Sequence, residues 1–184
     1  MTHSLRSAAI PLKKAALYGA LIGAAALLAS CRTGIDAKIP TLICPATGFV
    51  KDTTSLTRFR AGGSYQPADV LYEAEVAGLA TGCVNENGTI VETVSFTVNG
   101  EKGPAFGGDQ VSIPYFVAIT TKAGQIVAKE VYDAPLSFDS AGRASIPQRV
   151  QQSLMVKAPR DTANYEVLIG LQLSDDDLVY NISQ

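Results

Sequence analysis

Residues 89–100 read TIVETVSFTVNG, and apolar and polar side chains alternate through the middle of the stretch. Val94, Phe96 and Val98 fall on one side of that alternation, and the residues between them are serine and threonine. Successive side chains of a β-strand point to opposite faces of the sheet. The stretch therefore predicts a strand with one buried face and one solvated face.

The residues before this strand predict its hairpin partner. Residues 85–88 read NENG, a turn signal, and residues 69–78 (DVLYEAEVAG) alternate with the same period of two. Glu73 and Glu75 lie two positions apart, so on a strand they share one face. Paired carboxylates can cleave glycosidic bonds. Alternating glutamates are also the ordinary pattern on the solvent side of an antiparallel sheet, which is the role we expect.

The chain beyond residue 100 continues in β patterns. Residues 110–120 (QVSIPYFVAIT) are apolar on both faces and predict a buried central strand, followed by a hairpin into residues 125–133. Residues 143–157 and 163–173 read as extended segments, whereas residues 44–69 are turn-rich and contribute apolar side chains to the core. About seven short strands with Gly and Asn turns predict an all-β fold, a single antiparallel β-sandwich of the immunoglobulin or fibronectin type.

A short helix is expected at the C-terminus. Residues 174–181 read SDDDLVYN, in which Ser174 and Asp177 have the spacing of a capping box. The run of aspartates at 175–177 could suggest calcium, but such a site needs six to eight oxygen ligands in a suitable loop. Acidic residues in the first turn of a helix are stabilised by its dipole, and we expect that role for them.

The N-terminal residues differ in composition from the rest of the chain. Residues 1–30 contain three basic residues and no acidic residue, and residues 15–28 form an apolar run. That order is typical of a secretory signal peptide. The apolar run is shorter than the roughly 20 residues needed to span a bilayer, although an uncleaved signal anchor remains an alternative.

Removal of residues 1–30 would limit the chemistry open to the mature chain. It leaves 12 basic and 17 acidic residues, and it removes His3, the only histidine. The resulting net charge of about −5 argues against nucleic acid as a partner. Without histidine, a Ser-His-Asp or Cys-His catalytic arrangement is excluded. We therefore expect a protein that is not an enzyme, with no catalytic residues, metal site or cofactor.

Residues 28–31 read LASC, which resembles the lipobox of bacterial lipoproteins. The resemblance implies that Cys31 is the first mature residue and carries acyl chains such as palmitate, so that residues 31–43 form a tether to the membrane. The following residue, Arg32, is not the aspartate that can retain lipoproteins in the inner membrane. The outer membrane of the cell envelope, on its periplasmic side, is the expected location. The alternative is an ordinary signal peptide with an incidental cysteine.

Acylation of Cys31 would leave Cys44 and Cys83 as an even pair. Exported proteins occupy an oxidising compartment, which favours a disulfide between these two residues. A reactive redox pair is the alternative, but the sequence has neither a Cys-x-x-Cys motif nor a mature histidine to activate a thiolate.

Several stretches, among them DVLYEAEV, GPA, PYFVAI and YEVLIGLQL, resemble a group of small, uncharacterised bacterial envelope lipoproteins. That resemblance implies a similar fold and a location in the envelope, but it does not imply any activity. We therefore expect residues 44–184 to form a nonenzymatic binding or assembly module, with an envelope protein as partner at an exposed sheet edge. The alternatives are a carrier of a lipid or other apolar ligand, and a histidine-independent hydrolase acting on envelope glycans.

Overall fold

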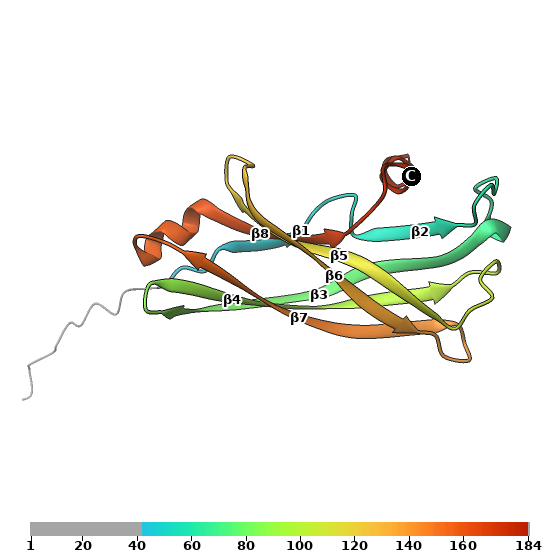
Figure 1. Ribbon diagram of the computed structural model, residues 1–184, viewed down its shortest axis with the longest axis horizontal. Coiled ribbons are helices and arrows are strands. Elements are labelled where there is room, and N and C mark those ends of the chain that lie inside the picture. The colour runs from blue at the N-terminus through green and yellow to red at the C-terminus, as the bar shows by residue number, and fades with distance from the viewer. Residues whose placement is uncertain (1–41, 184) are drawn as a thin grey trace, which may run out of the picture. The chain divides into compact units, whose positions relative to one another are not determined.

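The computed structural model describes residues 42–183, which form two four-stranded β-sheets packed face to face (Figure 1). One sheet has the strand order β1-β8-β5-β6 and the other has β2-β3-β4-β7. The predicted all-β antiparallel sandwich is confirmed. The strands are β1 (Ala46–Phe49), β2 (Ser55–Phe59), β3 (Val70–Glu86), β4 (Thr89–Lys102), β5 (Gln110–Thr121), β6 (Ile126–Ser137), β7 (Arg143–Met155) and β8 (Tyr165–Leu171).

The strand pairing adds two features to the prediction. Residues 44–69, expected to be turns, supply the short strands β1 and β2, so that each sheet has four strands instead of the four and three of an immunoglobulin constant domain. β1 runs parallel to β8, whereas the other pairs in the two sheets are antiparallel.

The β3–β4 hairpin supplies much of the core. Val94, Phe96 and Val98 of β4 are buried, as their alternation predicts. The Phe96 ring packs edge-on against Phe49 of β1 and Tyr115 of β5, with ring centroids 6.2 and 5.2 Å apart, so it fixes one sheet against the other. The turn of the hairpin has positive φ at both central residues, which asparagine and glycine at residues 87 and 88 tolerate.

The C-terminal helix α2 (Asp175–Ile182) is confirmed, together with its capping box. The Ser174 backbone N–H donates to Asp177 Oδ2 at 2.9 Å, and the Asp177 N–H donates to Ser174 Oγ at 3.3 Å. Asp177 also forms an ion pair with Arg58 of β2 at 3.1 Å, and Asn181 Nδ2 donates to the Ser55 carbonyl at 2.8 Å. The helix therefore lies against β2, near the C-terminal end of the chain in Figure 1.

No helix within residues 42–183 is long and apolar enough to cross a bilayer.

A loop between β2 and β3, residues 60–69, is organised around the buried carboxylate of Asp69. Asp69 Oδ2 accepts hydrogen bonds from Ser64 N at 2.7 Å and Ser64 Oγ at 3.0 Å, and Oδ1 pairs with the Arg60 guanidinium. A Cβ on Gly63 would lie 3.0 Å from Asp69 Cγ, so glycine lets the loop approach the carboxylate closely without a crowded contact. The backbone N–H of Ser64 is the main cause that lowers the pKa of Asp69 below its ordinary 3.8.

This lowered pKa predicts an acid-sensitive loop. Because the folded pKa of Asp69 lies below the unfolded value, its contribution to stability is present above about pH 4 and is lost as the pH falls through the folded pKa. Asp69→Asn should therefore show a smaller loss of melting temperature on acidification than the parent chain, measured by circular dichroism between about pH 6 and pH 2. Glu86→Gln, at the exposed β3–β4 turn, is the control. Equal acid sensitivity of the parent chain and Asp69→Asn would contradict the assignment of this acid sensitivity to Asp69.

Candidate functional site

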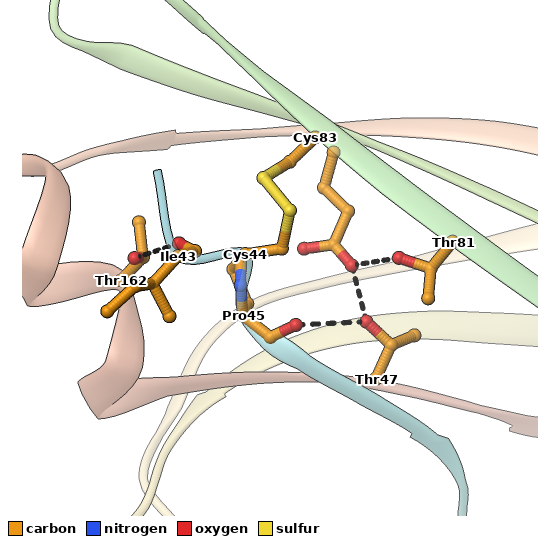
Figure 2. Close-up of a disulfide and its surroundings, with 8 residues drawn as sticks. Ile43, Cys44, Pro45, Thr47, Thr81, Cys83 and Thr162 are labelled. Carbon is orange, nitrogen blue, oxygen red and sulfur yellow. Dashed lines mark hydrogen bonds between the residues drawn. A yellow bond between two sulfur atoms is a disulfide. The ribbon is translucent and has the colours of Figure 1, made fainter. Parts of the chain in front are cut away.

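The predicted disulfide between Cys44 and Cys83 is present (Figure 2). Their Cα atoms lie 5.6 Å apart, and the bridge joins the residue two positions before β1 to the distal half of β3. Because β1 and β3 belong to different sheets, the bond links the two layers of the sandwich covalently. Both cysteines are used in this structural bond.

The chain around Cys44 is also held by hydrogen bonds. Thr162, in the 3₁₀ helix η2 (Pro159–Asn164), donates from its hydroxyl to the Ile43 carbonyl, as Figure 2 shows. Thr47 donates to the Pro45 carbonyl at 3.4 Å. The start of the described chain is therefore attached to the domain from Ile43 onward. Cys31 and the leader lie outside the described residues, so acylation stays a prediction.

A buried acid next to the disulfide is the main polar feature that sequence reasoning missed. Glu92 is 2% exposed and pairs in register with Cys83 on one side and Gln152 on the other. Its Oε1 accepts hydrogen bonds from the hydroxyls of Thr47 and Thr81, whereas Oε2 has no hydrogen-bond partner among the described residues. Glu92 continues the inward-facing alternation of Val94 and Phe96, and that signal could have identified it. A carboxyl sealed from solvent in this way cannot contact a substrate.

Glu73 and Glu75 share the outer face of β3, as predicted, and both are exposed. They line a surface groove of about 630 Å³ on the β2-β3-β4-β7 sheet, together with Glu101, which is the register partner of Glu73 on β4. The Asn99 amide donates to Glu75 at 3.3 Å. This open groove has the character of a solvated acidic face. No group of three His, Cys, Asp or Glu side chains within residues 42–183 is placed to hold a metal ion.

β6 presents the most exposed apolar strand edge in the described part of the chain. It lies at the edge of its sheet and has one ladder neighbour there, β5. Residues 122–131 are all exposed, and they include Ile126 (66% exposed), Val127 (53%) and Val131 (55%). The ammonium of Lys129 lies 4.4 Å from the Phe116 ring centroid, so this charge is held over the neighbouring strand.

The other three sheet edges are better protected. β1 and β2 have only four and five residues, and α2 packs against β2. β7 is long but carries Pro147, which cannot donate a backbone hydrogen bond, and two exposed arginines. β6 carries Lys129, Glu130 and Pro135, but its proline lies beyond the exposed stretch of residues 122–131. An unpaired strand edge can accept a further strand, so β6 is the candidate interaction site.

The comparisons with known proteins do not assign a family. No family model matches the chain, and no curated protein gives a significant match. Among solved structures, the variable (V) domain of the AgI/II polypeptide BspA from Streptococcus agalactiae is similar over 67% of this chain and 78% of that domain. The sequence identity is 12% and the TM-score is 0.20, so this similarity adds nothing to the fold described above.

Proposed function

We propose that the chain is a lipid-anchored binding module of the bacterial envelope, in which β6 recruits an extended segment of a partner protein. The exposed edge of β6 is the observation that supports this proposal. An added strand would pair with the free backbone groups of β6 and cover Ile126, Val127 and Val131. The acylated Cys31 would hold the module at the outer membrane on the periplasmic side.

The two alternative functions receive less support from the geometry. A carrier needs interior volume for its ligand, but side chains such as Leu136 and Ile169 pack between the sheets and are almost fully buried. A glycan hydrolase needs an acid and a base that surround a bound substrate. Glu73 and Glu75 instead lie side by side on a solvated sheet face. A binding role for β6 requires neither feature.

Site-specific crosslinking tests the β6 interface. A photoreactive residue at Val131 of the full chain, in intact cells, should give a discrete product with an envelope protein. A Val127→Lys substitution in the same chain should reduce that product roughly tenfold, because a buried valine contributes about 1.5–3 kcal/mol and lysine would resist burial.

Val84 provides the matched control for crosslinking, because it is 53% exposed and lies on β3 of the other sheet. A probe at Val84 should not give the product. The same products from both positions, or no loss with Val127→Lys, would contradict the proposal. A product of twice the chain's own mass would mean that the edge pairs with a second copy, and would overturn the assignment of a different partner.

A further inference from the structure

Tyr65 occupies a position that the fold alone does not explain. Its φ of 55° is in the left-handed region, which bulky residues rarely adopt, and the residue is 58% exposed. Hydrogen bonds from Ser64 and an ion pair with Arg60 hold the loop of residues 60–69 to the buried Asp69 carboxylate. The backbone that carries Tyr65 is therefore ordered without a ligand. A backbone in this region that carries a largely exposed aromatic ring is typical of a binding position.

Tyr65 belongs to a surface cluster of three aromatic rings. Its ring is nearly parallel to that of Tyr180 on α2, with an angle of 18° between the planes and 6.4 Å between centroids. Phe59 of β2 packs edge-on against each of them at 5.1 Å. The cluster borders a cavity of about 250 Å³ between the loop, β2 and the N-terminal part of α2, and Ser174 and Asp176 contribute polar atoms to its wall.

Each of the two arginines at this cavity is paired with a carboxylate. Arg58 pairs with Asp177 at 3.1 Å, and Arg60 pairs with Asp69. Asp176 is exposed and adds a further negative charge. Two arginines already neutralised by carboxylates do not create the positive field that a phosphate or other anion needs. They still present N–H donors beside the carboxylate acceptors, a combination that suits neutral hydroxyl groups.

From these features we infer that the cavity binds a neutral saccharide, with the ring of Tyr65 against the C–H face of the sugar. The electron-rich face of an aromatic ring attracts the weakly positive hydrogens of such a face. Arg60 and Asp176 supply the donor and acceptor for hydroxyl groups at the rim. The volume lies just below the range of about 300–1,000 Å³ for drug-sized ligands, so it fits about one sugar ring. This site is separate from the β6 edge and does not depend on it.

Saturation-transfer NMR on the full chain, in a detergent without a sugar headgroup, tests the inference. The probes are glucose, galactose, N-acetylglucosamine, maltose and N,N′-diacetylchitobiose, each at about 10 mM, above the millimolar range in which small ligands bind. At least one probe should bind. Tyr65→Asn should weaken its binding about tenfold or more. Asparagine tolerates the positive φ, which offsets part of the ring packing lost against Phe59 and Tyr180, so the melting temperature should change little. Tyr65→Phe should stay within about threefold of the parent, because the stacking ring is kept.

Ile126→Ala on β6 is the matched control and should leave saccharide binding unchanged, which separates this site from the proposed partner interface. The inference is overturned if none of the five sugars binds, or if binding survives Tyr65→Asn. It is also overturned if inorganic phosphate binds in place of the sugars, since the two arginines would then form an anion site.

Discussion

Replacing Cys44 by serine should lower the free energy of unfolding by about 4 kcal/mol. The bridge to Cys83 closes a loop with a sequence separation of 39 residues, and a crosslink of that span removes considerable conformational entropy from the unfolded chain. Single domains are typically stable by only about 5–15 kcal/mol, so this loss would be a large part of the total. Denaturant unfolding of the full chain, followed by circular dichroism, measures it.

Three comparisons make this measurement specific to the disulfide. All variants carry Cys31→Ser, so that no third thiol can exchange with the bridge. Cys83→Ser should match Cys44→Ser, and the double substitution should cost little more than either alone. Dithiothreitol should destabilise the parent and leave the variants unchanged. A loss well below about 1 kcal/mol would show that the bridge constrains the unfolded chain far less than the loop-closure model predicts.

Replacing Cys31 by alanine should release the protein from membranes into the soluble envelope fraction. Each buried CH₂ of an acyl chain contributes about 0.8 kcal/mol, and several chains together hold a protein persistently. Loss of the attachment thiol removes all of them at once. Fractionation of cells, with an alkaline carbonate wash of the membranes, measures the distribution.

Cys44→Ala is the matched control for this experiment, because it removes a cysteine and leaves the proposed attachment residue in place. It should stay in the membrane fraction. Unchanged membrane association of Cys31→Ala after removal of residues 1–30 would contradict acylation, and retention of residues 1–30 on the parent chain would identify an uncleaved signal anchor.

The strands that the sequence predicts well are those whose side chains alternate over many residues. β4 shows this clearly, because Val94, Phe96 and Val98 recur on one face and the turn residues before the strand mark its hairpin. β1 and β2 were missed because four or five residues are too short to establish a period. The parallel pairing of β1 with β8 joins Ala46 to Glu166, and no local pattern reports a contact so distant along the chain.

The candidate sites divide in a similar way. The Cys44–Cys83 bridge followed from the compartment and the number of cysteines, whereas the exposure of Ile126 depends on the packing of the surrounding elements. Residues 125–133 read as an ordinary strand, so sequence could not single out its free edge. Tyr65 was also missed, because neither its positive φ nor its contacts with the rings of Phe59 and Tyr180 can be read from the local sequence.

The position of the disulfide has a mechanical consequence. A pulling force on the chain before Leu42 enters the domain beside Cys44, ahead of the four-residue strand β1. Without the bridge, that force would peel β1 from β8 a few hydrogen bonds at a time. With it, the load passes through a covalent bond into β3, which is joined to β4 by a long antiparallel ladder. A domain attached to a moving surface by its N-terminal side would resist extraction for as long as this bond stays oxidised.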